Sequence, residues 1–124
     1  MKHAVLLVDH GSRRGEANQV LEELALRLRA RLPEQIVKFA HMDLAEPTVA
    51  QAIAACVAEG ATEIVVHPYF LVPGSHSTVD IPRLARGALS AHPDVRLRIT
   101  PPLGVHEGMV EVVLARLREA ESAG

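Results

Sequence analysis

The sequence of 124 residues is poor in aromatic side chains, with no tryptophan, one tyrosine and two phenylalanines. A hydrophobic core must therefore be built from valine, leucine, isoleucine and alanine, which dominate the 48% share of hydrophobic residues. A chain of this length buries about two thirds of the surface that its unfolded form exposes, which is enough for one core. We therefore expect one domain spanning residues 1–124.

Cysteine is scarce as well, because Cys56 is the only one. A lone thiol excludes an intrachain disulfide and fits a reducing, cytoplasmic location. No apolar run approaches the roughly 20 residues needed to cross a bilayer, and the short apolar run after Met1 lacks the length and cleavage site of a signal peptide. The formal net charge of −2 gives no reason to expect a basic surface for nucleic acid. Neither a membrane nor a nucleic acid is an expected partner.

Strand-like and helix-like segments alternate four times along the chain. Residues 4–8 form a continuous apolar run, which is typical of a strand buried on both faces. Residues 36–42 and 64–66 predict two further strands. Over 95–99, apolar residues alternate with arginines, which predicts a fourth strand that lies at an edge or has one face in water.

Apolar residues at helical spacing predict four helices, over residues 16–31, 48–59, 80–91 and 107–120. Thr48 is the expected start of the second helix, with Gly60 just past its end. Asp80 is the expected N-cap of the third. In the last helix, four apolar residues are expected to face the core, namely Met109, Val112, Val113 and Leu117.

This alternation predicts an α/β fold, a three-layer doubly wound sheet of about four parallel strands with helices on both faces. The usual strand order for a small sheet of this kind is 2-1-3-4. Ligands of such sheets bind beyond the carboxyl ends of the strands, at the point where the strand order reverses. The loops after the first and third strands should therefore share one mouth.

Three of the loops that follow strands carry side chains able to bind a metal ion. His10 follows the first strand, Asp43 and Glu46 follow the second, and His76 lies in the long loop after the third. The predicted strand order brings His10 and His76 together. Neutral imidazole binds borderline divalent metals and accepts a proton near neutral pH. A weak two-histidine site can hold an ion and still release it, unlike a closed four-ligand site.

The glycines and serines around these histidines are expected to offer free backbone N–H groups ahead of a helix, a natural seat for anions. Arginines nearby in the sequence could also pair with carboxylates, namely Arg13, Arg14, Arg83 and Arg86. Composition and spacing thus indicate a metal ion together with a polyanionic ligand, and they go no further. A phosphate-handling hydrolase fits less well, because Asp9 stands where an arginine would precede the histidine of such an enzyme.

Three motifs resemble those of a known enzyme family. They read VDHGSR from Val8, HMDLAEP from His41 and, the most specific, PYFLVPGSHSTVDIP from Pro68. In this order, and over nearly the whole chain, they resemble the short CbiX-type sirohydrochlorin cobaltochelatases. These are class II chelatases related to the sirohydrochlorin ferrochelatases.

The resemblance implies ATP-independent insertion of a divalent metal ion, with Co²⁺ as the expected ion, into sirohydrochlorin in cobalamin or sirohaem synthesis. Chelation of Fe²⁺ or Ni²⁺ and a non-catalytic carrier of metal or tetrapyrrole stay open as alternatives. The residue matching His10 would be a metal ligand and proton acceptor, and the one matching His76 the second ligand. Metal insertion needs both abilities, because the ion must shed water and two pyrrole N–H protons must leave.

The resemblance also implies substrate contacts and a partner subunit. The tetrapyrrole would touch Glu46 and the loop residues Leu71, Val72, Pro73, Gly74 and Ser75; the seat for anions adds Ser12 and Arg13. Because longer relatives carry two lobes, residues 1–124 would be a single chelatase lobe that forms a two-fold homodimer. Several relatives have a glutamate where this chain has Asp43, whose reach is one methylene shorter. Direct ligation by Asp43 and a role through a bridging water both stay open.

The remaining polar residues are expected to be structural. Asp9 could orient His10 or face the other way, and Glu46 at a helix start is favoured by the helix dipole whatever its function. Cys56 lies on an apolar helical stripe and is expected to be a small core residue. The same structural role is expected of the other histidines, His3, His41, His67, His92 and His106.

Overall fold

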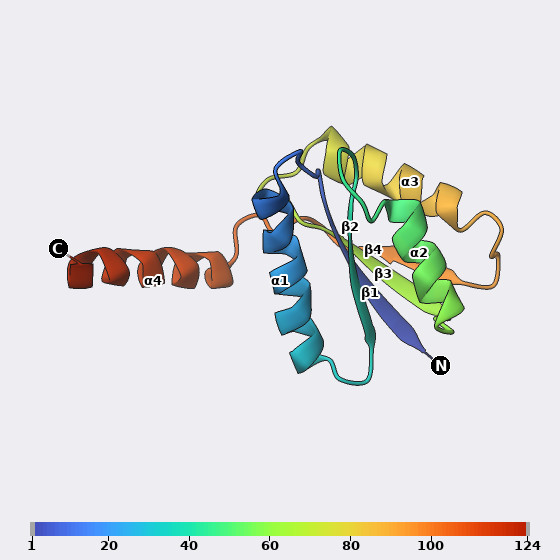
Figure 1. The fold of residues 1–124 in the computed structure, drawn as a ribbon, viewed down its shortest axis with the longest axis horizontal. Helices are drawn as coiled ribbons and strands as arrows, with labels where there is room; N and C mark the ends of the chain where they lie inside the picture. Colours follow the sequence, from blue (N-terminus) through green and yellow to red (C-terminus); the bar gives the residue numbers. More distant parts are fainter. Residues whose placement is uncertain (1, 124) are drawn as a thin grey trace.

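The computed structural model describes residues 2–123 and contains a parallel four-stranded sheet with strand order β2-β1-β3-β4 (Figure 1). The strands are β1 (His3–Asp9), β2 (Ile36–His41), β3 (Glu63–Pro68) and β4 (Arg96–Ile99). The carboxyl ends of β1, β2 and β3 lie nearly level, because Asp9 pairs with His41 and Val8 pairs with Pro68. The predicted α/β class, parallel pairing and strand order are confirmed, as is the place of the fourth strand at an edge.

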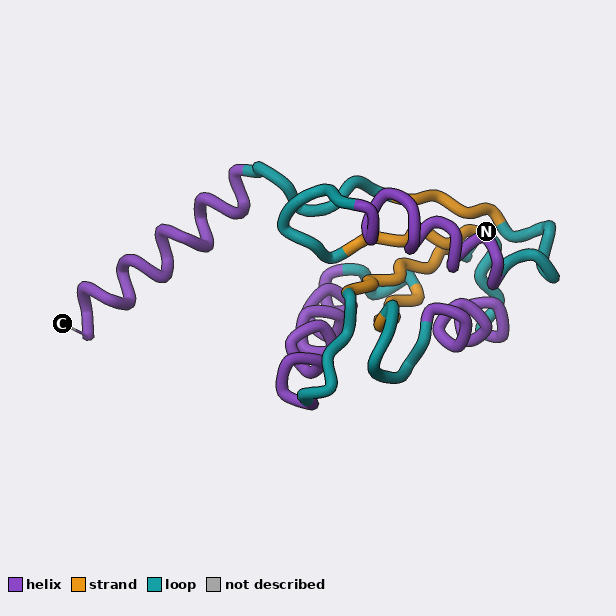
Figure 2. Tube along the Cα trace, turned by 90° about the horizontal axis from the view of Figure 1, so that it is seen from above, coloured by secondary structure: helices purple, strands orange, loops and turns teal. Residues whose placement is uncertain are grey.

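Helices cover both faces of the sheet, as predicted (Figures 1 and 2). Helix α1 (Gly15–Arg31) packs on one face, and α2 (Val49–Ala58) and α3 (Ile81–Ala88) pack on the other. A π-helix, η1 (His76–Asp80), leads directly into α3, and α4 (Glu107–Ala123) ends the described chain. Within residues 2–123, no helix has both the length and the apolar character that a bilayer crossing would require.

The apolar core has two parts, one on each face of the sheet. Because alternate residues of a strand point to opposite faces, β1 contributes Leu6 to the cluster under α2 and α3, and Leu7 to the cluster under α1. Ile53 of α2 and Leu21 of α1 are almost fully buried in these two clusters. Cys56 is buried in the larger one, as expected, and burial raises the pKa of its thiol to about 11. The thiol is thus held in its unreactive neutral form.

Helix α2 begins with a capping box. The hydroxyl of Thr48 accepts a hydrogen bond from the backbone N–H of Gln51 at 3.1 Å, and Oε1 of Gln51 accepts one from the backbone N–H of Thr48 at 2.8 Å. We expect Thr48→Ala to lower the free energy of unfolding by about 0.5–2 kcal/mol, because a helix N–H loses its partner. Urea unfolding measures the change. Thr48→Ser keeps the oxygen and serves as the control, so an equal loss in both variants would contradict the capping role.

Asp80 is not the N-cap of α3, and that prediction is wrong. Its backbone is already helical, with φ −69° and ψ −48°, because η1 runs into α3 without a break. A residue in helical conformation cannot turn its side chain onto the first free N–H groups of the helix in the usual way. The carboxylate of Asp80 is therefore available to other partners. Helix α3 also ends at Ala88, three residues earlier than the expected Ala91.

The expected inward face of the last helix is also wrong. Among the described residues of α4 none is buried, and the helix projects away from the sheet (Figure 2). The side chains of Val112, Val113 and Leu117 are 50%, 57% and 57% exposed. Helical spacing correctly indicated an apolar stripe, but spacing does not say which surface the stripe packs against.

Candidate functional site

The two histidines singled out by the sequence lie side by side beyond the carboxyl ends of β1 and β3. Their ring centroids are 5.0 Å apart and their planes are inclined by 68°. His10 is half-buried directly after β1, whereas His76 is the first residue of η1 and its side chain is 52% exposed. The neighbouring positions of β1 and β3 bring the two loops together, as the strand order predicted.

His10 is positioned by a tight loop against the segment that follows β2. Its backbone carbonyl accepts a hydrogen bond from the N–H of Asp43 at 2.9 Å. Its Nδ1 lies 3.2 Å from the carbonyl oxygen of Gly11. A carbonyl can only accept, so Nδ1 carries the proton in this contact and Nε2 keeps its lone pair. The free nitrogen is the one that could bind a metal ion or accept a proton.

His76 is oriented by Asp80 and Phe70. Its Nδ1 lies 3.0 Å from Oδ2 of Asp80, and its ring stacks on Phe70 with 6.5 Å between centroids. The other carboxylate oxygen of Asp80 accepts a hydrogen bond from Arg83 at 3.2 Å. A carboxylate on Nδ1 fixes the tautomer and the orientation of the ring and leaves Nε2 free, as it does behind metal-binding histidines. Sequence reasoning missed both roles, although the spacing of four residues between His76 and Asp80 on one helical face was a usable signal.

Asp9 pairs with His41 and not with His10. Its Oδ1 lies 2.6 Å from Nδ1 of His41, whose side chain is only 1% exposed, so this pair ties the end of β1 to the end of β2. His67 makes a local hydrogen bond with Thr100 at 2.7 Å, and burial lowers its pKa. Both histidines therefore have structural partners, as the sequence analysis expected of them.

The carboxylates of the loop after β2 have local partners. Asp43 Oδ1 accepts a hydrogen bond from the N–H of Leu44 at 2.8 Å, and Glu46 accepts one from the side chain of Gln51 at 2.8 Å, at the start of α2. Asp43 and Asp80 line a shared hollow of about 240 Å³. Within residues 2–123, no group of three or more histidine, cysteine, aspartate or glutamate side chains is placed to hold one metal ion. Ligation by Asp43 stays a prediction.

The loop after His10 closes on Asn18, which the sequence analysis did not single out. The N–H of Ser12 donates to Asn18 Oδ1 at 2.9 Å, and the carbonyl of Ser12 accepts from Asn18 Nδ2 at 2.7 Å. The N–H of Gly74 donates in turn to the Ser77 hydroxyl at 3.1 Å. These two amides are therefore not the free donors expected from the sequence. Arg13 is exposed, and substrate contacts by Ser12 and Arg13 stay predictions.

An apolar and solvent-exposed surface lies next to the two histidines. Leu71 and Val72 are 65% and 69% exposed, and the other residues of the predicted substrate loop, Pro73, Gly74 and Ser75, are exposed as well. On the other side, Tyr69 and Phe70 line a hollow of about 290 Å³ that includes His10. Apolar walls around a few polar groups are typical of sites for small organic ligands.

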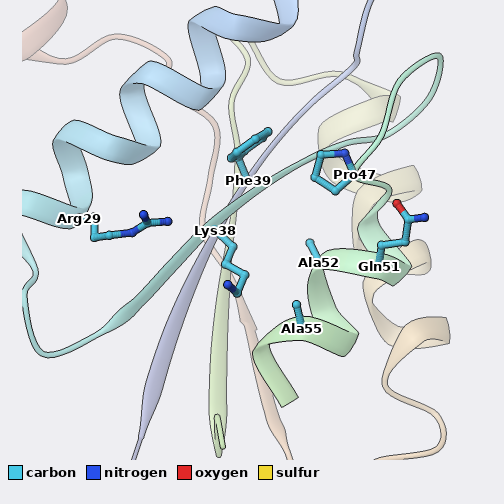
Figure 3. Close-up of a pocket in the computed structure, with 7 residues that line it drawn as sticks. All are labelled: Arg29, Lys38, Phe39, Pro47, Gln51, Ala52 and Ala55. Atoms are coloured by element: carbon cyan, nitrogen blue, oxygen red, sulfur yellow. The ribbon is translucent and has the colours of Figure 1, made fainter. Parts of the chain in front are cut away.

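A third hollow, of about 250 Å³, lies on the edge strand β2 between α1 and α2 (Figure 3). Its two cationic side chains already have partners. Arg29 donates to the carbonyl of Val37 at 2.7 Å, and Lys38 pairs with Glu59. None of the predicted site residues lines this hollow, so it is separate from the histidine pair.

Comparison with known proteins finds relatives that are named sirohydrochlorin chelatases. The sirohydrochlorin ferrochelatase of Arabidopsis thaliana, a chloroplast protein, is 42% identical over 118 residues, which cover 95% of this chain and 52% of the relative. The sirohydrochlorin cobaltochelatase of Methanococcoides burtonii is 30% identical over 126 residues, covering 95% of this chain and 96% of the relative.

Solved structures agree in fold. SirB from Bacillus subtilis with Fe³⁺ superposes with a TM-score of 0.89 at 33% identity, over 97% of this chain and 48% of that one. The sirohydrochlorin chelatase SirB of Bacillus subtilis subspecies spizizenii in complex with cobalt gives 0.88 at 33% identity, over 96% and 51%. The chain thus spans about half the length of these structures and of the Arabidopsis relative. The CbiX family model matches residues 4–120. The chain belongs to the CbiX family.

Proposed function

We propose that this chain is one lobe of a sirohydrochlorin chelatase, which inserts a divalent metal ion into the tetrapyrrole without ATP. The observation that carries the proposal is the pair of imidazoles, 5.0 Å apart, at the mouth formed by the ends of β1 and β3. The names of the relatives, a ferrochelatase and a cobaltochelatase of sirohydrochlorin, agree with it. So does the exposed apolar loop next to His76, which suits the face of a flat macrocycle.

In the proposed mechanism, the Nε2 atoms of His10 and His76 bind the incoming metal ion in place of water. Two neutral imidazoles leave open positions, so the ion can pass to the pyrrole nitrogens. The macrocycle loses two N–H protons as it gains the doubly charged ion, which balances the charge. His10, once released by the metal, accepts one of these protons and returns it to water, and the other proton passes directly to water. Asp80 holds the ring of His76 in place throughout.

The substrate contacts of the proposal are those expected from the sequence. The loop of Leu71, Val72, Pro73, Gly74 and Ser75 would lie against the macrocycle, and Ser12, Arg13 and Glu46 would meet its periphery. The exposure of the loop supports its part in this. Two copies of the chain would form a two-fold homodimer, and the length of the Arabidopsis relative, about twice that matched here, supports a two-lobed active form.

We propose Co²⁺ as the physiological ion, because the Methanococcoides relative, which the chain matches over nearly its whole length, is named for cobalt. The Arabidopsis relative is named for iron, and the affinity order of divalent metals lets a two-histidine site accept Fe²⁺, Co²⁺ or Ni²⁺. Competition between equal concentrations of these ions, with the products separated by their visible spectra, measures the preference. Preferential insertion of Fe²⁺ would refute the choice of cobalt and leave the chelatase intact.

A turnover assay tests the proposed activity. Purified protein is mixed with excess sirohydrochlorin and Co²⁺, and the change in visible absorbance is followed against the same mixture without protein. We expect many equivalents of product per protein chain. A plateau at one equivalent per site would identify a carrier of metal or tetrapyrrole and would refute the enzyme.

Replacing Asp43 with asparagine is expected to have a mild effect. Asparagine keeps an oxygen for the N–H of Leu44 but removes the charge that would act on the metal through a bridging water. Loss of such a supporting group lowers metal affinity by about 10–100-fold, and we expect the lower end of this range. Titration with Co²⁺ measures the affinity. A complete loss of binding would show that Asp43 is a direct and indispensable ligand.

A further inference from the structure

A hollow of about 580 Å³ lies beyond the carboxyl end of β4, between the segment 99–104 and residues 73–82, with Arg86 of α3 in its wall. We call it the β4 hollow. It is larger than the hollow of about 290 Å³ that includes His10. Ligands of parallel sheets bind beyond the carboxyl ends of the strands. The β4 hollow is therefore at the binding edge of the sheet, and the mechanism proposed above leaves it unused.

The β4 hollow adjoins the histidine pair. One wall is formed by the two residues of η1 that directly follow His76, and another by Pro73 of the predicted substrate loop. The wall after β4 is bonded to the same loop, because the N–H of Gly104 donates to the carbonyl of Leu71 at 3.0 Å. A macrocycle seated over a metal ion at His76 would therefore carry part of its rim across the β4 hollow.

Arg86 brings a positive charge without a partner to this hollow. The arginines that line other hollows are already engaged, since Arg29 donates to the carbonyl of Val37 at 2.7 Å and Arg83 to Asp80 at 3.2 Å. Within residues 2–123, by contrast, the guanidinium of Arg86 takes part in none of the ion pairs. It is exposed, in the last turn of α3. The guanidinium is therefore left to pair with an anion from outside the chain.

The hydroxyls that line the β4 hollow have already donated their protons. Those of Ser77 and Thr78 both donate to the carbonyl of Gly74, at 3.1 and 2.8 Å. That of Thr100 donates to the carbonyl of Pro101 at 3.0 Å. Among the lining side chains of the described residues, the guanidinium is thus the donor that stays available, and it fits a group that can only accept, as a carboxylate does.

The other walls of the β4 hollow are apolar. They consist of Pro73, Pro82, Ile99, Pro101 and Pro102. Apolar walls around one cation suit a carboxylate on a short alkyl chain, because the methylene groups can pack on the prolines while the carboxylate meets the guanidinium. The rim of sirohydrochlorin carries acetate and propionate side chains, which are groups of this kind.

We propose that the β4 hollow is a subsite for one acetate or propionate side chain of the tetrapyrrole, whose carboxylate is bound by Arg86. The inference rests on the proposed function and adds a substrate-binding residue to it. Arg86 is separate from the two imidazoles that would hold the metal ion. It should therefore strengthen binding of the macrocycle and leave the rate of insertion from the bound state unchanged.

Titration with metal-free sirohydrochlorin tests the subsite without any turnover, because the visible spectrum of the tetrapyrrole reports its binding. We expect Arg86→Ala to raise the dissociation constant by about 10-fold, the effect of losing one hydrogen bond between charged groups at an exposed position. Arg86→Lys keeps the charge but not the planar fork of donors, so its dissociation constant should lie between those of Arg86→Ala and the wild type. Circular dichroism checks that both variants fold, as the exposure of Arg86 leads us to expect.

Arg31→Ala is the matched control. Arg31 is exposed at the end of α1, ahead of the amino end of β2, so the variant removes the same charge far from the histidine pair. Its dissociation constant for sirohydrochlorin should equal that of the wild type. An equal loss of affinity in Arg31→Ala and Arg86→Ala would reveal a general attraction between a polyanion and surface cations, and would overturn the subsite.

The outcomes separate the subsite from the proposed function. If Arg86→Ala binds sirohydrochlorin as tightly as the wild type, the subsite is refuted and the chelatase proposal stands. If the wild type itself does not bind sirohydrochlorin, the proposed function fails and the subsite fails with it.

Steady-state kinetics give a second readout, which a merely structural role of Arg86 would not produce. For Arg86→Ala we expect the KM for sirohydrochlorin to rise by about the same 10-fold factor, while kcat stays at the wild-type value, because binding is weakened and the chemistry is untouched. A lowered kcat at an unchanged KM would place Arg86 in the metal-insertion step and overturn the subsite.

Discussion

Alanine in place of His10 or His76 is expected to slow metal insertion by about two to four orders of magnitude, the range that a positioned acid–base group contributes. Each variant removes one of the two nitrogens that would hold the ion. Folding should survive, because His76 is half exposed and His10 lies beyond the last residue of β1. The initial rate of Co²⁺ insertion into sirohydrochlorin measures the effect, with circular dichroism as the check on folding.

The control for these variants is His3→Ala. His3 is at the amino end of β1, where it contacts Glu63 at 3.5 Å, whereas the site lies beyond the carboxyl end of the same strand. This variant should insert metal at the wild-type rate. Wild-type turnover by His10→Ala or His76→Ala would refute the proposed site, even if the wild-type protein is a chelatase.

The two variants should differ in their response to metal concentration. A lost ligand lowers the occupancy of the site, which a higher Co²⁺ concentration can restore. A lost proton acceptor lowers the rate even at full occupancy. Because the proposed mechanism gives His10 both roles and His76 one, His76→Ala should recover more of its rate at high Co²⁺ than His10→Ala. The opposite order would reverse the roles of the two residues.

The sequence was sufficient to predict the fold and the meeting of His10 and His76. Continuous apolar runs define buried strands whatever the details of their partners, and a parallel sheet with a known strand order allows few arrangements of the loops. Two residues 66 positions apart could therefore be placed at one mouth without knowledge of any side-chain contact. The histidines stood out because few other metal-binding side chains follow β1 and β3.

What could not be predicted depends on local conformation and on partners outside the pattern. Asp80 would be an N-cap only if the helix began there. It does not begin there, because a π-helix leads directly into α3. The amide of Ser12 is satisfied by Asn18, six residues on, which no periodicity reveals. The stripe of α4 was visible, but hydrophobic spacing is the same whether a helix packs on its own sheet or on that of another chain.

Gly11→Ala is expected to damage both stability and activity, although it adds a single methyl group. Gly11 has a φ of +94°, and a Cβ there would lie 1.9 Å from the carbonyl oxygen of Asp43 and 3.0 Å from Cβ of His41. The first of these atoms is backbone and cannot rotate away, so the loop itself must move. Strain of this kind amounts to about 1–3 kcal/mol, and we expect a loss in that range in the free energy of unfolding measured with urea.

The effect of Gly11→Ala on catalysis should exceed what the lost stability explains. His10 precedes the glycine and is bonded through its carbonyl to the N–H of Asp43 at 2.9 Å, so the loop cannot shift without carrying the imidazole with it. A displacement of reacting groups by about 1 Å can lower a rate about 100-fold. Gly87→Ala in α3 has open space around the new methyl group and should keep full activity. If Gly11→Ala inserted metal like the wild type, the position of His10 would not matter to the reaction, and the two-imidazole mechanism would fail with it.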